Sequence, residues 1–301
     1  MRTAIFGAGS DLGVHIDGAS LGPEQLINDI KTFYKGEIFS YKQDPEIIKS
    51  RNLSDRRKNE YEINQFNTVL YNSMLGKIKE ENFPILIGGD HSVAVASALA
   101  SVKANIDVGI IWIDAHTDYN TFETTITGNI HGLPLAAITG YKCSELREFH
   151  DGKIIQPSRC VIVGARSIDD GEKDNVKYSG VTVFSTQDIK EKGVEAIMDE
   201  AFKIAGYKTK GIHISYDLDV IDPKVAPGVS VPEDDGISEE EAMEINKYLA
   251  KHMNDILSFD LVEFNPLRDQ ERRTEQIALN ILSQIINAAE KKKKWEQKIY
   301  Y

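Results

Sequence analysis

The stretch Val108-Gly109-Ile110-Ile111-Trp112-Ile113-Asp114-Ala115-His116-Thr117-Asp118 joins an apolar run to a short polar segment. The run Val108–Ile113 is hydrophobic on almost every position, as in a strand that is buried on both faces of a parallel sheet. Asp114, His116 and Asp118 follow at intervals of two residues, and in an extended chain residues at that spacing share one face. The stretch therefore predicts a central strand whose carboxyl end carries a cluster of acids and imidazole.

Two further segments repeat this arrangement. Ile85-Leu86-Ile87-Gly88-Gly89-Asp90-His91-Ser92 brings His91 just beyond an apolar run, and His213-Ile214-Ser215-Tyr216-Asp217-Leu218-Asp219 brings two acids to the end of another. Ligands of open α/β sheets bind beyond the carboxyl ends of the strands. We therefore expect the three segments to converge at one edge of the sheet.

Short apolar runs alternate with amphipathic segments along the whole chain. Further strands are predicted at 3–6, 84–87, 160–163, 181–184, 211–215 and 256–262, and helices at 23–34, 54–79, 92–103, 194–205, 238–252 and 274–289. This alternation predicts a doubly wound α/β fold with helices on both faces of a mainly parallel sheet. No linker, low-complexity tract or repeat divides the chain, so a single domain over residues 1–301 is expected.

Composition excludes several classes of protein. Lys plus Arg is 35 and Asp plus Glu is 47, a formal net charge of −12, which argues against a nucleic-acid or membrane-surface protein. The apolar runs are far shorter than the roughly 20 residues that span a bilayer. The N-terminal sequence does not have a signal-peptide pattern, and the two cysteines do not form a CxxC motif. A cytoplasmic protein is expected.

The acidic and histidine residues at the three strand ends indicate a metal site. They comprise two imidazoles and four carboxylates: His91, His116, Asp114, Asp118, Asp217 and Asp219. Four clustered carboxylates repel one another strongly in a partly dry pocket, and two divalent cations would cancel their formal charge. An oxygen-rich donor set with some imidazole and no thiolate suits Mn²⁺. The sequence thus predicts a binuclear manganese centre.

Other features receive structural interpretations. Asp90 is interpreted as a turn or helix-cap residue, and His213, deeper in its strand, as a satisfied core histidine. Gly18-Ala19-Ser20-Leu21-Gly22 matches the nucleophile-elbow pattern GxSxG but lacks the buried strand that must precede it. The lysine run at 291–294 follows a helix and is interpreted as a solvated helix end.

Together these motifs resemble a known family. Gly-Gly-Asp-His-Ser at 88–92, Asp-Ala-His-Thr-Asp at 114–118 and Ser-Tyr-Asp-Leu-Asp-Val-Ile-Asp-Pro at 215–223 are similar to the three signatures of the ureohydrolases, the arginase and agmatinase superfamily. The resemblance extends to about Pro266. It implies a three-layer αβα fold around a mainly parallel eight-stranded sheet, with two Mn²⁺ per subunit.

The intervening segments look most like the arginase branch. The motif DYNT at 118–121, continued by TGNIHG at 127–132, resembles DxNT…SGNxHG. Residues 164–172, GARSIDDGE, resemble GxRDxDxxE, and residues 261–266, LVEFNP, resemble xxExNP.

The resemblance also implies roles for individual residues. One metal ion would be held by His91, Asp114, Asp118 and Asp217, and the other by Asp114, His116, Asp217 and Asp219. A bridging hydroxide, oriented by Asp118, would attack the guanidinium carbon, with His131 as proton shuttle and Glu263 paired with the guanidinium. At the other end of the substrate, Asn120 and Thr127 would bind the α-carboxylate, while Asp169 and Glu172 would lie near the α-amino group.

Two departures from the arginase pattern bear on the substrate. Where arginases usually carry GTPVxGG, residues 226–236 read APGVSVPEDDG, so that Val231 replaces threonine and Asp234-Asp235 replaces a glycine-rich turn. The Gly-Val-Ser at 228–230 also resembles formimidoylglutamases, and Thr127 replaces the usual serine.

The resulting functional hypothesis is Mn²⁺-dependent hydrolysis of L-arginine to L-ornithine and urea. It implies a small cationic guanidino substrate, no nucleic-acid or membrane partner, and a homo-oligomer, trimer or hexamer. The alternatives are another ureohydrolase (a formimidoylglutamase, agmatinase or guanidinobutyrase), a dinuclear phosphoesterase, and a non-catalytic metal-binding paralogue.

Overall fold

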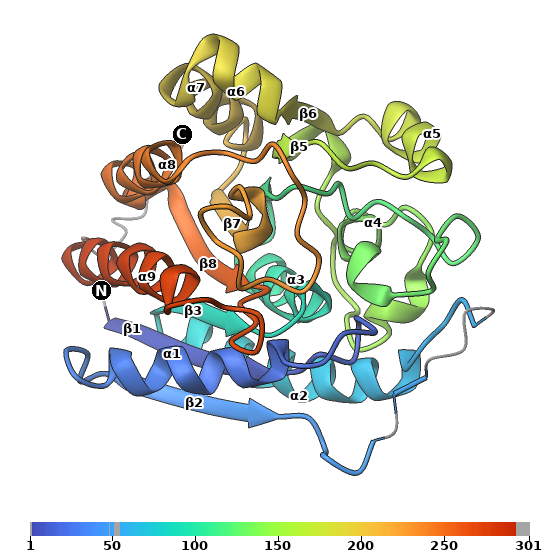
Figure 1. The fold of residues 1–301 in the computed structure, drawn as a ribbon, viewed down its shortest axis with the longest axis horizontal. Coiled ribbons are helices and arrows are strands. Elements are labelled where there is room, and N and C mark those ends of the chain that lie inside the picture. Colours follow the sequence, from blue (N-terminus) through green and yellow to red (C-terminus); the bar gives the residue numbers. More distant parts are fainter. Residues whose placement is uncertain (1, 48, 51–54, 293–301) are drawn as a thin grey trace.

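A parallel eight-stranded sheet forms the centre of the protein in the computed structural model, which describes residues 2–47, 49–50 and 55–292 (Figure 1). The strands are β1 (Arg2–Gly9), β2 (Glu37–Lys42), β3 (Asn82–Gly88), β4 (Val108–Ile113), β5 (Cys160–Ala165), β6 (Thr182–Ser185), β7 (Gly211–Asp217) and β8 (Ile256–Val262). Their order in the sheet is β2-β1-β3-β8-β7-β4-β5-β6, and each neighbouring pair is parallel. All the carboxyl ends therefore lie along one edge.

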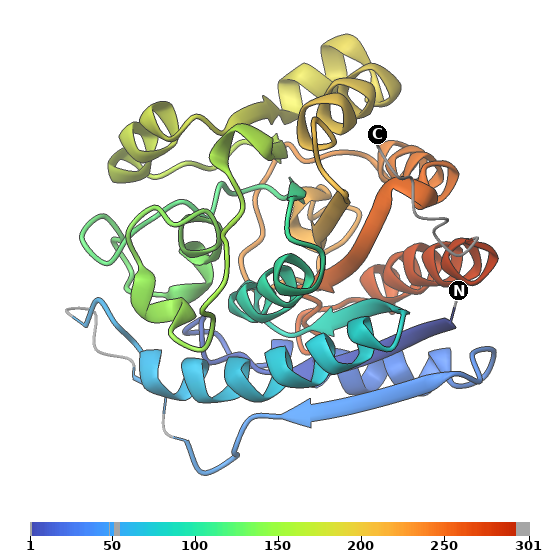
Figure 2. The ribbon, with the colours of Figure 1, turned by 180° about the vertical axis from the view of Figure 1, so that it is seen from behind.

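Helices cover both faces of the sheet. Those on the face turned to the viewer in Figure 1 include α1 (Gly22–Ile30), α7 (Val194–Ala205), α8 (Glu239–Lys251) and α9 (Arg273–Lys291). On the opposite face lie α2 (Glu60–Lys79) and α3 (Ala94–Asn105), which come to the front in Figure 2. The shorter helices are α4 (Pro134–Ile138), α5 (Asp170–Ser179) and α6 (Thr186–Lys192). The three-layer αβα fold is thus confirmed.

Side chains of the central strands alternate between two hydrophobic cores. Ile111 and Ile113 of β4 belong to the core under α7, α8 and α9, whereas Ile110 and Trp112 belong to the core under α2 and α3. All four are fully buried. Because both faces of β4 are covered, the strand requires a continuous apolar run rather than an alternating one.

The sheet order determines where the motifs meet. Strands β3, β8, β7 and β4 are consecutive in the sheet, although β8 follows β3 by well over a hundred residues in the chain. The segments that follow these four strands therefore lie side by side at the carboxyl edge, as the sequence predicts.

Several local predictions are confirmed. Ser238 caps α8 by accepting a hydrogen bond from the Glu241 amide, and Pro23 lies in the first turn of α1. Ser20 lies in a short 3-10 helix and donates to Asp11 Oδ2 at 2.9 Å, so this GxSxG segment is not a nucleophile elbow. Within the described part of the chain, no helix is both long and apolar enough to cross a membrane.

Other elements were missed or shifted. Strand β2 was not predicted because it is a half-exposed edge strand without a buried apolar run, and the short helices α4, α5 and α6 were not predicted either. Predicted helix 23–34 ends at Ile30, and predicted helix 54–79 begins at Glu60. Ser54, with which that prediction began, lies outside the described residues, as do Lys293 and Lys294 of the lysine run. At Lys292 the interpretation of this run as a solvated helix end is wrong, because the side chain is buried and donates to the Ile256 carbonyl.

Candidate metal centre and active site

His91 is held rigidly at the end of β3. Its Nε2 lies 2.8 Å from Ser215 Oγ, and its ring stacks on Trp112 with 3.9 Å between centroids. The preceding residue, Asp90, accepts hydrogen bonds from the amides of Ser92 and Gly13, which confirms its interpretation as a cap. These contacts leave His91 Nδ1 as the nitrogen that faces the acids.

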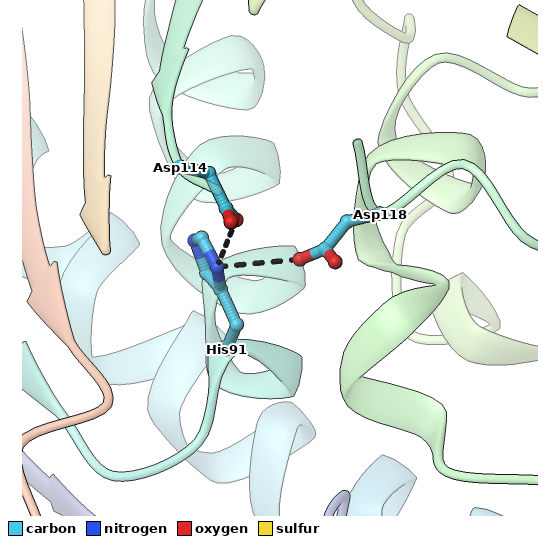
Figure 3. A group of neighbouring side chains, drawn as sticks. All are labelled: His91, Asp114 and Asp118. Atoms are coloured by element: carbon cyan, nitrogen blue, oxygen red, sulfur yellow. Dashed lines mark ion pairs between the residues drawn. The ribbon is translucent and has the colours of Figure 1, made fainter. Parts of the chain in front are cut away.

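Three carboxylates converge on that nitrogen. Oxygens of Asp217, Asp114 and Asp118 lie 3.0, 3.1 and 3.3 Å from His91 Nδ1, and Figure 3 shows the approach of Asp114 and Asp118. Nevertheless, Nδ1 is buried without a hydrogen-bond partner. A buried nitrogen that faces several carboxylate oxygens without bonding to any of them has the geometry of a metal ligand.

A second group adjoins the first. His116 Nδ1 lies 3.0 Å from Asp219 Oδ2 and 3.4 Å from Asp114 Oδ1. In each of the two triads, His91–Asp114–Asp118 and Asp114–His116–Asp219, one potential ligand atom per residue lies within 4.8 Å of the others. Asp114 belongs to both triads, with Oδ2 facing His91 and Oδ1 facing His116, so its carboxylate could contribute to both metal positions.

The electrostatics of the cluster favour added positive charge. Burial, together with neighbouring carboxylates, raises the pKa of Asp118 and of Asp217 well above the usual range. Burial also acts to raise the pKa of Asp114, but the neighbouring His116 and His91 rings lower it overall. The two imidazoles thus compensate only part of the acid, and the oxygen-rich donor set fits a pair of divalent cations.

His131 and Glu263 form a separate pair beside the metal centre. His131 Nδ1 lies 2.9 Å from Glu263 Oε1, which also accepts a hydrogen bond from the His91 amide at 2.9 Å. Burial acts to lower the pKa of His131, but its hydrogen bond to Glu263 raises the pKa overall. The other oxygen, Glu263 Oε2, is buried and has no hydrogen-bond partner.

The backbone is strained at two of these positions. Asp118 and Glu263 have φ angles of 48° and 69°, in the left-handed region that residues with a side chain rarely adopt. Such conformations persist where the surrounding structure enforces them, and they cluster at functional sites.

The structure brings together three of the four residues that were assigned to the amino-acid end of the substrate. Asn120 Nδ2 donates to Asp169 Oδ2 at 3.1 Å, and Glu172 Oε1 accepts from the Tyr119 amide at 2.6 Å. Asp169 and Glu172 also form the capping box of α5. Thr127 is exposed further along the same loop, where its hydroxyl accepts from the Asn129 amide at 3.2 Å.

Sequence reasoning missed several residues that support this site. Ser215 and Trp112 orient His91, and Glu233 Oε1 lies 3.5 Å from His116 Nε2. Ser215 could have been identified, because it precedes Asp217 by two residues and so shares its face of β7. Glu233 has no such local signal.

The fold and the two triads define a binuclear metallohydrolase built on an α/β sheet. The Arginase family model matches residues 1–287. Arginase from Bacillus subtilis is 36% identical, with 77% of this chain and 80% of that protein covered; arginase from Brevibacillus brevis is 34% identical, with 94% and 96% covered. The crystal structure of arginase from Bacillus cereus superposes with a TM-score of 0.86 at 30% identity and covers 98% of this chain and 99% of its own. The chain belongs to the arginase family of ureohydrolases.

Proposed function

We propose that this protein hydrolyses the guanidinium group of L-arginine to give L-ornithine and urea, with two Mn²⁺ per subunit. The observation that carries the proposal is the pair of triads sharing Asp114, with the His131–Glu263 pair directly beside them. A metal pair and a proton-transfer group next to each other are what hydrolysis of a resonance-stabilised guanidinium requires.

Six residues would hold the metal ions. The first ion is assigned to His91, Asp114, Asp118 and Asp217, and the second to Asp114, His116, Asp217 and Asp219. The orphaned Nδ1 of His91 and the excess of buried carboxylates support this assignment. When bound, two such ions supply a hydroxide nucleophile at neutral pH and a counter-charge for the tetrahedral transition state.

Glu263 would hold the reacting end of the substrate. Its Oε1 is occupied by His131 and the His91 amide, which leaves Oε2 as a buried acceptor without a partner. A guanidinium N–H group would satisfy that oxygen with a charge-assisted hydrogen bond. Asp118, whose carboxylate faces the same centre, would orient the attacking nucleophile.

His131 would move the proton. Its Nδ1 is anchored to Glu263, so the ring has a fixed orientation and its Nε2 remains to exchange protons. By delivering a proton to the departing nitrogen of ornithine, His131 would prevent the loss of an unstable amide anion.

The amino-acid end of the substrate would lie near the loop after β4. Asn120 and Thr127 are assigned to the α-carboxylate, and Asp169 and Glu172 to the surroundings of the α-amino group. The contact between Asn120 and Asp169 supports a shared subsite. Glu172 is mainly engaged with the Tyr119 amide, so we assign it the task of holding this loop in place.

A second ureohydrolase activity is the main alternative. Val231 occupies the place of a threonine in the arginase pattern, and Asp234-Asp235 that of a glycine-rich turn. These changes leave both triads intact, so they bear on the substrate rather than on the metal chemistry. Formimidoylglutamate, agmatine and guanidinobutyrate are the substrates to compare.

A substrate panel tests the proposal. Manganese-loaded protein is assayed with arginine, agmatine, guanidinobutyrate and formimidoylglutamate, with Asp217→Ala protein as the matched control. We expect urea and ornithine from arginine and no turnover by the control. Urea from agmatine or guanidinobutyrate without urea from arginine, or formamide from formimidoylglutamate alone, would assign another activity.

We further propose a cytoplasmic homo-oligomer, a trimer or hexamer, on the basis of the family resemblance. Light scattering coupled to size-exclusion chromatography measures the mass directly. A monomeric mass at micromolar concentration would contradict this part of the proposal.

A further inference from the structure

His116 presents its two ring nitrogens to different partners. Nδ1 faces Asp219 and Asp114 in the second triad, while Nε2 faces Glu233 Oε1 at 3.5 Å. When Nδ1 donates its lone pair to a cation, the ring proton must reside on Nε2, which then becomes a hydrogen-bond donor. Histidine ligands almost always donate this second N–H to a carboxylate, a carbonyl or water.

The main chain around Glu233 is held by hydrogen bonds from Arg166, which follows the end of β5. Arg166, just beyond β5, donates to the carbonyl oxygens of Glu233 and Asp234 at 2.8 and 2.9 Å. The same guanidinium donates to the carbonyls of Asp219 and Val220 at 2.8 and 3.0 Å. One side chain therefore ties the segment that bears Glu233 to the turn that bears the ligand Asp219.

Ser167 completes the surroundings of the Glu233 carboxylate. Ser167 of the β5 loop and the His116 ring are polar neighbours of this carboxylate. Ser167 stands where the pattern GxRDxDxxE has its first aspartate. The chain thus lacks an acid at that position of the loop after β5. Glu233, in the segment after β7, supplies a carboxylate beside Ser167 instead.

We propose that Glu233 is a positioning residue of the metal centre: it accepts the N–H of His116 Nε2, fixes the tautomer of the ring and keeps Nδ1 directed at the second metal position. The inference rests on the metal centre of the proposed function and not on which substrate is used. The neighbouring Asp234 is exposed and contributes only its carbonyl to the Arg166 contact, so it offers a matched control.

Manganese titration of the whole protein tests this role. The binding affinity of each of the two ions is measured by calorimetry and by metal analysis after dialysis, for the wild type, Glu233→Gln, Glu233→Ala and Asp234→Asn. Loss of a carboxylate behind a ligating histidine typically weakens metal affinity roughly 10- to 100-fold. We expect that loss for one ion in Glu233→Ala, a smaller loss in Glu233→Gln, which keeps an acceptor oxygen, and none in Asp234→Asn.

A double variant separates positioning from general destabilisation. Adding Ser167→Asp to Glu233→Ala returns an acid to the β5 loop, and we expect it to recover most of the lost affinity. The thermal midpoints of the metal-free proteins are measured in parallel, and the recovery of metal affinity in the double variant should not follow any change in those midpoints.

The outcomes are distinguishable. Wild-type affinity for both ions in Glu233→Ala would overturn the proposal. If Ser167→Asp does not restore binding, an acid at position 167 cannot take the place of Glu233. A wild-type protein that binds two manganese ions but does not act on arginine would overturn the proposed substrate and leave the role of Glu233 intact.

Discussion

Two clusters of histidine and aspartate include residues only four positions apart on β7, His213 and Asp217, and they differ in how evenly imidazoles and carboxylates are matched. In the core, His213 Nδ1 lies 2.7 Å from Ser258 Oγ and its Nε2 lies 3.0 Å from Asp260 Oδ2, with no exposure of either ionisable residue. At the carboxyl end, His91 Nδ1 faces three carboxylates and bonds to none.

The comparison shows what separates a structural ion pair from a ligand set. The core cluster matches one imidazole with one carboxylate and adds hydroxyl groups from Ser97 and Ser258. The metal cluster sets four carboxylates against two imidazoles, an imbalance that burial makes unfavourable unless cations are added. Each cluster has a buried atom without a hydrogen-bond partner, Asp260 Oδ1 in the core and His91 Nδ1 at the carboxyl end, so it is the excess of acid that marks the functional cluster.

The largest expected effect comes from removing a shared ligand. Asp217→Ala should lose metal binding, and its turnover should fall below detection, because its carboxylate is assigned to both ions. Metal analysis after dialysis against manganese measures the first and a urea assay the second. Full dinuclear occupancy in this variant would show that the ligand assignment is wrong.

His131→Ala should separate metal binding from catalysis. We expect two bound manganese ions but a turnover reduced roughly 10²- to 10⁴-fold, the usual contribution of a general acid or base. Metal analysis and steady-state kinetics on the same sample make the measurement. Loss of metal in His131→Ala would mean that His131 contributes to metal binding and is not a separate proton-transfer group.

The core cluster should respond in the opposite way. Asp260→Ala leaves His213 buried without its charged partner, and breaking a buried pair of this kind costs roughly 3–5 kcal/mol in the free energy of unfolding. Urea denaturation measures that loss, while the folded fraction should still bind two manganese ions. An unchanged unfolding free energy would mean that the core pair is not a structural element.

Metal removal should have the smallest effect on stability. Ligand linkage predicts about 2.7 kcal/mol of stabilisation at a manganese concentration of 100 times Kd. Chelation should therefore lower the unfolding free energy of the wild type and of Asp260→Ala by similar amounts, and that of Asp217→Ala hardly at all. If chelation lowers the unfolding free energy of Asp217→Ala by the same amount, the metal binds at a site that does not include Asp217.

This metal effect should increase with pH. In the metal-free protein, burial acts to lower the pKa of His116, but Asp219 and Asp114 raise it well above 6.5. Protonated His116 therefore stabilises the metal-free fold at low pH, and that contribution is lost as the pH rises through the raised pKa. Manganese needs the deprotonated ring, so the difference between loaded and metal-free protein should widen over the same interval.

Much of the fold and the metal cluster could be predicted because the information is local. Each candidate ligand lies at the end of a buried strand or within a few residues after it, and the two-residue spacing of Asp114, His116 and Asp118 predicts that their side chains share a face. The pairing of His213 was predictable for a similar reason, since it lies inside its strand rather than at the end.

What escaped prediction depends on long-range contacts or on weak patterns. Glu233 faces His116 only because β4 and β7 are neighbours and Arg166 fixes the intervening main chain. Strand β2 has half-buried and exposed side chains at the edge of the sheet and lacks the continuous apolar run by which the buried strands were recognised. The spacing of Asp169 and Glu172 is that of a capping box, a structural role that the resemblance to a substrate-binding motif obscured.

The insertion of β8 between β3 and β7 also has a consequence for the order of events during folding. The amide of His91 is hydrogen-bonded to Glu263, 172 residues further along the chain, so the position of this candidate ligand depends on a long loop closure. Contacts of such sequence separation form slowly because the chain entropy lost in closing the loop comes first. We therefore expect manganese to be captured by a sheet that is already assembled and not to act as a nucleus around which the chain collapses.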